Sequence, residues 1–288
     1  MRVPLDALQS LAWPARRSAS GTRSGTHPST LRGRAPELSA YRAYRSGDDV
    51  RDMDWKLLAR SDRAYVRLSE DRAIHPTWIV VDATASMAFP VATRAKWESA
   101  CALAIGLAFL AHKAGDPVGL RVVGGSAPGE TSLAPSTRRD VVPALAALLA
   151  GVTPAGDASL GPAMAERASG GRLVVVSDGL EVGEAWRDAA NRWLAAGGDV
   201  VVVQVLSRDE WVPTDHARVV DPEDAGCERE LGAEAREGYA AALSAWVRRE
   251  SDWWRGRGAA FHSLVAEDDV VQGIRTIVAE PLAAAEAR

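Results

Sequence analysis

Residues 77–87 read TWIVVDATASM, and this stretch decides the fold class. Its apolar half, Trp78 to Val81, is short and rich in β-branched residues, which is typical of a strand covered on both faces. Similar runs follow at 118–123, 173–176 and 200–206. Helical periodicity lies between the runs, at Ala92–Ala114, Asp140–Ala150 and Gly183–Ala196. Strands that alternate with helices of this length predict an α/β fold with a doubly wound, mostly parallel sheet.

The alternation continues on both sides of this region. Downstream we expect a short strand at Arg218–Asp221, a long helix at Ala233–Arg255, a strand at Phe261–Val265 and a last helix at Asp268–Glu280. Upstream, the alternating residues Tyr65–Leu68 predict an edge strand. The chain therefore divides into a basic extended arm at 1–36, a segment at 37–76 packed on the main domain, that main domain at 77–280, and a tail at 281–288.

Composition places the chain among ordinary globular proteins. Of its 288 residues, 47% are hydrophobic and 25% are charged, which excludes the class of highly charged disordered chains. No apolar run reaches the ~18 residues that a membrane-spanning helix needs. Two cysteines, Cys101 and Cys227, are too few for a disulfide framework, so we expect reduced thiols and a cytoplasmic protein.

The arm at 1–36 has a charge of its own. It carries six arginines and one acidic residue, Asp6, in a chain whose net charge is −4. Its many Ser, Gly, Thr and Pro residues predict extended structure that depends on the main domain for order. We expect the arm to lie on an acidic surface. Nucleic acid is disfavoured as a partner, because the arm is short and the whole chain has a pI of about 5.8.

Oxygen-bearing side chains directly follow two of the predicted strands. Asp82, Thr84 and Ser86 come after the first strand, and Asp178 comes after the strand at 173–176. Ligand sites in such sheets lie at the carboxyl ends of strands. Oxygen ligands suit a hard divalent cation, so we predict Mg²⁺ or Mn²⁺ held by these four side chains. The alternative is structural, because an Asp at a strand end can simply accept hydrogen bonds from backbone N–H groups.

A dense polar and aromatic segment precedes the main domain, and residues 44–55 read YRSGDDVRDMDW. Its charges can pair with each other or cap a short helix, and its tryptophan can anchor the segment by burial. We favour a structural clasp over a catalytic site, formed by Tyr44, Gly47, Asp48, Asp49, Arg51, Asp54 and Trp55. In this clasp Trp55 is buried against the main domain, and Arg51 pairs with Asp48 or Asp54.

These motifs resemble those of known families. WIVVDATASM is similar to the first metal-site motif of von Willebrand factor A domains, usually D-x-S-x-S, and VVVSDG resembles the strand-end Asp of the same fold. The segment at 44–55 closely resembles the signature of a bacterial family named domain of unknown function 58, whose members join it to a von Willebrand A-like, Rossmann-like domain. The chain departs from the metal pattern at Ala158, which stands where the fold supplies a Thr, so the resemblance implies a weak or vestigial metal site.

The resemblance implies a non-enzymatic protein-interaction module. The partner that it implies is a MoxR-type AAA+ ATPase, often with other von Willebrand A proteins, in chaperone-like assembly or maturation. The sequence lacks the nucleophile elbow, the phosphate-binding loop and the dinucleotide-binding turn of common enzymes. The enzymatic alternative is a metal-dependent phosphatase of the haloacid dehalogenase type with Asp82 as nucleophile, although Thr84 stands where that chemistry requires a second carboxylate.

Overall fold

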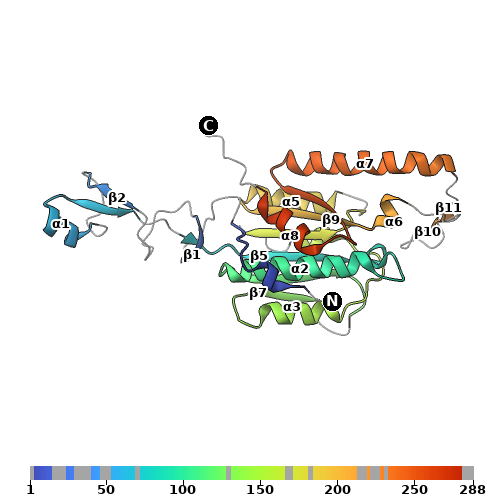
Figure 1. Cartoon of the computed structure of the whole chain (residues 1–288), viewed down its shortest axis with the longest axis horizontal. Coiled ribbons are helices and arrows are strands. Elements are labelled where there is room, and N and C mark those ends of the chain that lie inside the picture. Colours follow the sequence, from blue (N-terminus) through green and yellow to red (C-terminus); the bar gives the residue numbers. More distant parts are fainter. Residues whose placement is uncertain are drawn as a thin grey trace.

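A six-stranded sheet forms the centre of the protein (Figure 1). The structure is a computed structural model that describes residues 3–14, 24–28, 40–45, 53–68, 72–127, 131–165, 171–180, 184–212, 219–220, 228–229 and 233–280. The sheet consists of β5 (Thr77–Ala83), β6 (Val118–Gly124), β7 (Ser132–Ser136), β8 (Arg172–Ser177), β9 (Asp199–Leu206) and β12 (Ala260–Val265). The strand order is β12-β9-β8-β5-β6-β7, and every pair is parallel except β6 with β7.

The direction in which the chain adds strands reverses between β5 and β8. From β5 the chain adds β6 and β7 on one side, and it then crosses to add β8, β9 and β12 on the other. This arrangement confirms the predicted α/β fold with a doubly wound, mostly parallel sheet. A crevice opens at such a reversal, outside the carboxyl ends of the two strands, and it is the usual place for a binding site.

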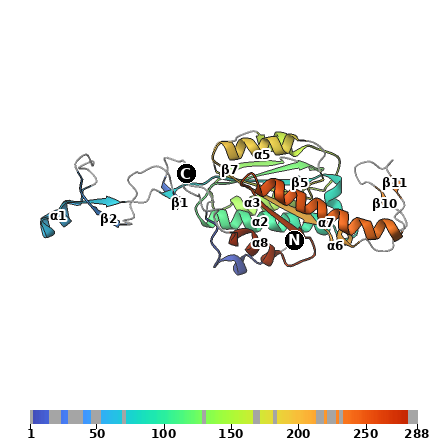
Figure 2. The ribbon, with the colours of Figure 1, turned by 90° about the horizontal axis from the view of Figure 1, so that it is seen from above.

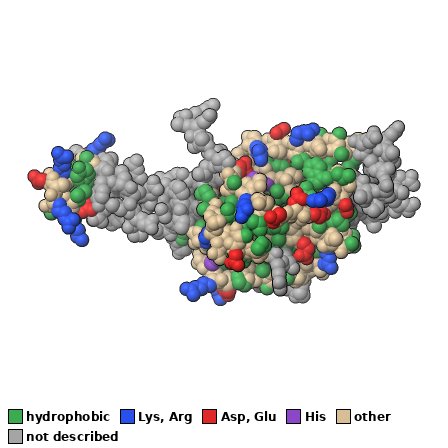
Figure 3. All heavy atoms as spheres, viewed as in Figure 1, with side chains coloured by type: hydrophobic (Ala, Val, Ile, Leu, Met, Phe, Trp, Pro, Cys, Tyr) green, Lys and Arg blue, Asp and Glu red, His purple; other side chains and the backbone are tan. Residues whose placement is uncertain are grey.

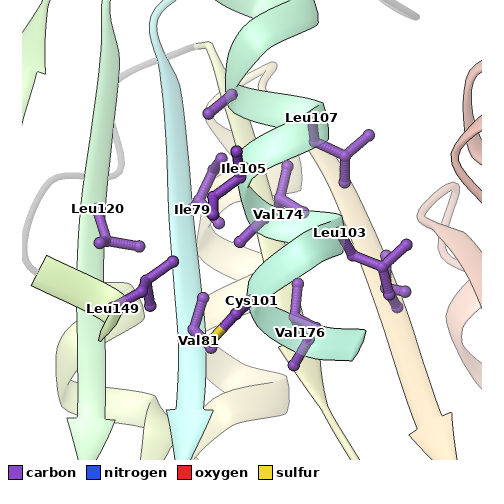
Figure 4. Packing of buried hydrophobic residues seen from close by; sticks show 14 of the residues in the cluster. Ile79, Val81, Cys101, Leu103, Ile105, Leu107, Leu120, Leu149, Val174 and Val176 are labelled. Atoms are coloured by element: carbon purple, nitrogen blue, oxygen red, sulfur yellow. The ribbon is translucent and has the colours of Figure 1, made fainter. Parts of the chain in front are cut away.

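Helices cover both faces of the sheet (Figure 2). One face packs against α2 (Ala95–Lys113), α3 (Val141–Ala150) and α8 (Val270–Ala279), and the other against α4 (Leu160–Ala165), α5 (Ala185–Ala195) and α7 (Ala233–Arg255). Figure 4 shows the first layer, in which Cys101, Leu103 and Ile105 of α2 meet the side chains of β5 and β8. Because α2 is rich in alanine, it lies close to the sheet and is buried along most of its length. None of the described helices is both long and apolar enough to cross a membrane.

The predicted elements of the main domain agree with the structure to within three residues at each end. Several short elements were missed, among them β7 and α4, whose patterns Pro135 and Pro162 interrupt. A proline is tolerated in β7 because this strand lies at the edge of the sheet, where a missing N–H leaves no neighbour unpaired. The strand expected at Arg218–Asp221 is β10 (Val219–Val220), which pairs with β11 (Glu228–Arg229) outside the main sheet.

The N-terminal strap, residues 3–14, packs on the main domain. It contains the 3-10 helix η1 (Leu5–Leu8), and Leu8 is buried beside Gly106 of α2. Trp13 is also buried, with the Arg172 guanidinium 3.8 Å from its ring centre. Nη2 of Arg172 donates hydrogen bonds to the carbonyl oxygens of Pro14 (2.8 Å) and Trp13 (3.3 Å). The strap is therefore held by apolar burial and by one buried cation.

The 3-10 turn at Leu5–Leu8 corrects the expected extended structure, whereas the packing agrees with the expectation that the arm depends on the main domain for order. The packing has a simple physical cause, because burying Leu8 and Trp13 gains more free energy than ordering the strap costs. Further along, β1 (Ser24–Pro28) pairs with β4 (Arg72–Ala73). All six arginines of the arm lie outside the described residues, so its contact with an acidic surface stays a prediction.

The segment before the main domain folds around its own short helix. β2 (Ala40–Ala43) pairs with β3 (Tyr65–Leu68), which confirms the predicted strand, and α1 (Trp55–Ser61) lies between them in the sequence. Asp54 caps α1, since its Oδ1 accepts hydrogen bonds from the N–H groups of Lys56 and Leu57, both at 3.0 Å. The N–H of Tyr44 donates to the carbonyl of Ala64 (2.9 Å). In Figures 1 and 2 these elements project from the body that holds the sheet.

The expected burial of Trp55 against the main domain is wrong. Trp55 is the first residue of α1 and is 59% exposed. The local reason is that the cap by Asp54 and the half-buried Leu57 and Leu58 fix this short helix, so its tryptophan is left on the outer side. Gly47, Asp48, Asp49 and Arg51 lie outside the described residues, and the pairing of Arg51 stays a prediction.

The two tryptophans should differ sharply in their effect on stability. Trp13→Ala removes a buried ring and its contact with Arg172, so we expect the free energy of unfolding to fall by about 3 kcal/mol or more. Trp55→Ala is the matched control and should change it by about 0.5 kcal/mol or less, because the ring is exposed. Denaturant midpoints of the two variants measure the difference, and equal midpoints would contradict this account of the strap.

Candidate functional site

The candidate site lies where the strand order reverses, at the carboxyl ends of β5 and β8. Asp82 is the last residue but one of β5, and Asp178 directly follows β8. Thr84 comes next after β5, and Ser86 belongs to the 3-10 helix η3 (Ala85–Ala88). Gly124, at the end of β6, has a φ of +77°, and a Cβ there would lie 3.1 Å from the nitrogen of Thr84. A glycine is therefore required for this turn to lie so close to β6.

Asp82 is the centre of a buried cluster of hydrogen bonds. Its Oδ1 accepts from the N–H of Thr84 (2.9 Å) and from the Thr84 hydroxyl (2.8 Å), and its Oδ2 accepts from the Ser177 hydroxyl (2.6 Å). The hydroxyl oxygens of Thr84 and Ser86 lie 3.2 Å apart. The structure thus brings together three of the four predicted site residues and adds Ser177, the last residue of β8.

The groups that donate to Asp82 are neutral, and this affects its ionisation. Burial and, to a smaller extent, the nearby charge of Asp178 raise the pKa of Asp82 from its ordinary value of 3.8 to about 6. The hydrogen bonds from Ser177 and Thr84 act in the opposite direction. At neutral pH the protein therefore holds a negative charge at Asp82 at a cost to its own stability.

Asp178 faces a buried cation instead. Nζ of Lys96, in the first turn of α2, donates to Oδ2 of Asp178 at 2.7 Å and to Oε1 of Glu210 at 2.9 Å. The Lys96 side chain is completely shielded from solvent. Burial by itself would lower the pKa of Lys96, but the charges of Asp178 and Glu210 outweigh burial and raise the pKa above its ordinary value. Lys96 is therefore a charged ammonium inside the protein.

Helix capping fixes Glu210 in turn. α6 (Arg208–Trp211) follows β9, and Ser207 forms a capping box with Glu210. The Ser207 hydroxyl accepts from the N–H of Glu210 (3.2 Å), and Oε2 of Glu210 accepts from the N–H of Ser207 (2.6 Å). One oxygen of Glu210 thus accepts from the backbone N–H of Ser207 while the other accepts from Lys96, so α6 is tied to the start of α2.

The long helix α7 borders the same edge of the sheet. Burial raises the pKa of Tyr239, and the charge of Glu210 adds to this rise whereas the charge of Lys96 opposes it, so Tyr239 lies close to the ion pair. Two turns later, Trp246 approaches the turn after Asp178, since its ring would lie 3.9 Å from a Cβ at Gly179. Both residues lie on α7 and are half-buried. Aromatic side chains of α7 therefore line one side of the cluster.

The loop that contains Ala158, where the resemblance places a metal-binding Thr, lies beside the end of β5. The side chain of Ala158 has no oxygen that could bind a metal. The N–H of Ala155 donates to the carbonyl of Ala83, and the N–H of Ala85 donates to the carbonyl of Gly156, both at 2.9 Å. Ala158 packs against the apolar cluster under α4 and α5. The Ser159 hydroxyl accepts from the N–H of Gly161 at 3.3 Å, at the start of α4. Ser159 therefore turns to α4.

The predicted donor set fits Mg²⁺ or Mn²⁺ only in part. Asp82, Thr84 and Ser86 converge, but Asp178 is bonded to Lys96, whose ammonium would repel a divalent ion at that carboxylate. Within the described ranges, no group of three His, Cys, Asp or Glu side chains is arranged to hold a metal. The full set of four therefore does not fit as it lies, and metal binding at Asp82 stays a prediction. The structural alternative is also seen, since both aspartates accept backbone N–H groups at the strand ends.

Exposed apolar side chains lie within five residues of Lys96, Asp178 and Glu210 in the sequence. In the described part of the main domain, the large apolar residues with high exposure are Val91 (82%), Leu180 (47%) and Val212 (68%). Val91 precedes α2, Leu180 follows Asp178, and Val212 ends α6. We call these three residues the carboxyl rim. They belong to loops that leave the carboxyl ends of β5, β8 and β9, and Figure 1 shows α6 at the end of the body opposite to β2 and α1.

Sequence reasoning missed the residues that neutralise and frame the site. Lys96 was not identified, although it is one of only three lysines in the chain and lies at the start of a helix whose middle is apolar, which is a usable signal. Glu210 belongs to a short capping motif after β9 and has no spacing relation to Asp82 or Asp178. Ser177 precedes Asp178 directly and could have been included for that reason.

The phosphatase alternative finds no support in this geometry. A nucleophilic Asp82 needs a free oxygen that faces substrate, but both of its oxygens accept hydrogen bonds and the residue is buried. Thr84, where the acid of that chemistry would stand, donates to Asp82. Lys96 is enclosed by two carboxylates and is not placed to bind a phosphate.

Neutral replacements of the two aspartates should change stability in opposite directions. The pKa of Asp82 is raised on folding, so ionisation destabilises the native state as pH rises from about 4 to about 6, by up to ~3 kcal/mol. Asp82→Asn should therefore stabilise the chelator-treated protein at about pH 7.5, with a gain that shrinks as pH falls through 6. Asp178→Asn should instead destabilise it by about 3 kcal/mol, because Lys96 loses a charged partner.

Thermal and denaturant unfolding across this pH range measure both effects. The account of Asp82 fails if Asp82→Asn is less stable than the wild type near pH 7.5, or if its effect does not depend on pH.

Comparisons with known proteins match most of the chain. Residues 40–247 match the model of the family described as "Protein of unknown function DUF58". "Uncharacterized protein Mb1516" of Mycobacterium bovis and "Uncharacterized protein Rv1480" of Mycobacterium tuberculosis are each 30% identical over 284 residues, covering 95% of this chain and 88% of theirs.

Solved structures with a similar fold are more distant in sequence. An aerotolerance-related membrane protein from Bacteroides fragilis has a TM-score of 0.45 at 17% identity and covers 70% of this chain and 96% of its own. BatB from Bacteroides thetaiotaomicron has a TM-score of 0.43 at 15% identity, covering 71% and 97%. A von Willebrand factor type A protein from Catenulispora acidiphila has a TM-score of 0.38 at 13% identity, covering 72% and 43%. On the family match over residues 40–247, the chain belongs to the DUF58 family of proteins.

Proposed function

We propose that this chain is a non-enzymatic protein-interaction module that docks on its partner through the carboxyl rim. The observation that carries the proposal is the position of the exposed apolar side chains Val91, Leu180 and Val212 around the end of the sheet where α/β proteins bind their ligands. Isolated exposed apolar residues are common on protein surfaces. Three on neighbouring loops, beside the half-buried aromatic residues of α7, are typical of a surface that another protein covers.

The buried ion pairs of Lys96 with Asp178 and Glu210 hold the loops that carry the rim. Lys96, Asp178 and Glu210 are held by short hydrogen bonds, and the loops that bear the rim start or end beside them. A surface whose loops are already fixed loses little conformational entropy when a partner binds. Figure 3 shows hydrophobic side chains interspersed with charged ones on the face of the body that it presents.

The partner that we propose is a MoxR-type AAA+ ATPase, together with other von Willebrand A proteins, in chaperone-like assembly or maturation. This part of the proposal is supported by the family resemblance. The cytoplasmic location predicted from the sequence is proposed together with this partner. The metal prediction is separate. The side chains that would hold Mg²⁺ or Mn²⁺ are Asp82, Thr84 and Ser86. The ion would supply positive charge beside the Asp82 carboxylate.

Charged substitutions on the rim test the proposal. Leu180→Asp and Val212→Asp each place a charge in the docking surface, so we expect each to weaken binding to a co-encoded MoxR-type ATPase by at least about tenfold. Ala147→Asp is the matched control on the exposed side of α3 and should leave the affinity unchanged. Interferometry with nucleotide present measures the affinities, and melting temperatures verify that each variant folds.

Two outcomes would overturn the proposal. If the rim variants bind as tightly as Ala147→Asp, the rim is not the docking surface. If the wild-type chain forms no complex with any co-encoded ATPase of this type, the partner assignment is wrong.

A further inference from the structure

Lys96 connects the three loops that carry the carboxyl rim. It lies five residues after Val91, at the start of α2. Its ammonium is 2.7 Å from Asp178, and the N–H of Leu180 donates to the other oxygen of that carboxylate (3.1 Å). It is also 2.9 Å from Glu210 of α6, the helix that Val212 ends. One buried charge therefore joins the segments after β5, β8 and β9.

A divalent ion at the same point would make the same connections. The carboxylate oxygens of Asp178 and Glu210 converge on Nζ from two loops, as two carboxylates converge on a shared cation. Mg²⁺ binds oxygen at about 2.0–2.1 Å, so each carboxylate would need to move by only ~0.8 Å to reach an ion placed at Nζ. The ammonium and such an ion would exclude each other, because two like charges cannot share one buried position.

The surroundings of Lys96 favour a permanent charge at this position. The N–H of Lys96 donates to the carbonyl of Phe89 (3.3 Å), in the segment that joins η3 to α2. The carbonyl oxygen of Asp178 accepts from Nε2 of Gln204 (3.0 Å), which fixes the turn after β8 to β9. The capping box holds Glu210, and Tyr239 of α7 lies against the ion pair. Each partner of Lys96 is thus positioned by a second contact of its own.

We infer that Lys96 is the resident cation of the carboxyl rim: its ammonium holds Asp178 and Glu210 together as a bound divalent ion would, and the rim keeps its shape without metal at this position. The inference rests on the proposed function only in treating the rim as a docking surface. Lys96 acts here as a positioning residue, since it is completely shielded and does not touch a partner.

Exchange of the lysine for an ion tests the inference in the full-length chain. Lys96→Ala leaves two facing carboxylates and the space of the lost side chain, so we expect the melting temperature in chelator to fall by roughly 10 °C. Millimolar Mn²⁺ or Mg²⁺ should restore most of this loss by binding between the carboxylates. Metal should not shift the wild type through Asp178, and Lys56→Ala, on the exposed surface of α1, is the control lysine variant.

A second variant keeps the test decisive if Lys96→Ala does not fold in chelator. Lys96→Ala combined with Asp178→Asn leaves only Glu210 charged, so it should be more stable than Lys96→Ala in chelator and should show no metal response beyond that of Asp178→Asn alone. A metal response of the wild type that survives in Asp178→Asn arises at Asp82 and agrees with the inference. A wild-type response that Asp178→Asn abolishes overturns it, and so does a Lys96→Ala protein as stable in chelator as the wild type.

Binding measurements separate this inference from the proposed function. The wild type should bind a co-encoded MoxR-type ATPase equally well in chelator and in Mn²⁺, in nucleotide conditions that leave the ATPase itself unchanged. Lys96→Ala should lose binding in chelator and regain it with Mn²⁺. If no complex forms with any variant, the proposed partner is wrong, whereas the melting temperatures still decide the role of Lys96.

Discussion

Two carboxylates meet at the reversal point of the sheet, and the protein must accommodate both in a site that excludes water. Asp82 and Asp178 are buried at the ends of the central strands β5 and β8. Like charges in such a site repel strongly, and each loses its hydration. The chain meets this constraint differently at the two positions. Neutral hydrogen-bond donors surround Asp82, whose pKa rises to about 6, and a lysine neutralises Asp178.

The position of several elements follows from the lysine. Because Nζ of Lys96 must reach Asp178, α2 begins beside the end of β8, and because it also binds Glu210, α6 is held against the same point. The loops between these elements then lie close to one another at the carboxyl edge. Their exposed apolar residues form the rim as a consequence, so a polar interaction in the interior determines the shape of an apolar surface.

A separate constraint acts at the amino edge of the sheet. Arg172, the first residue of β8, is buried. Its guanidinium lies over the ring of Trp13 and donates hydrogen bonds to carbonyl oxygens of the strap. The strap lies outside the part of the chain that matches the family, residues 40–247, yet Leu8 belongs to the main core. The tryptophan that anchors a flanking segment is therefore Trp13, whereas Trp55 of the family segment is exposed and free to contact something else.

The sequence by itself determined every strand of the main sheet except β7, the main helices and the placement of Asp82, Thr84, Ser86 and Asp178 at strand ends. It could do so because the periodicity of apolar residues and the end of each apolar run can be recognised within a short stretch of sequence. Only the tertiary structure decided that Lys96 and Glu210 complete the site, and that Trp13 rather than Trp55 is buried. Lys96 is separated from its partners by 82 and 114 residues, and Trp13 is 159 residues before Arg172. Contacts of this range form only when the crossover from β7 to β8 folds the chain back on itself, so no local pattern records them.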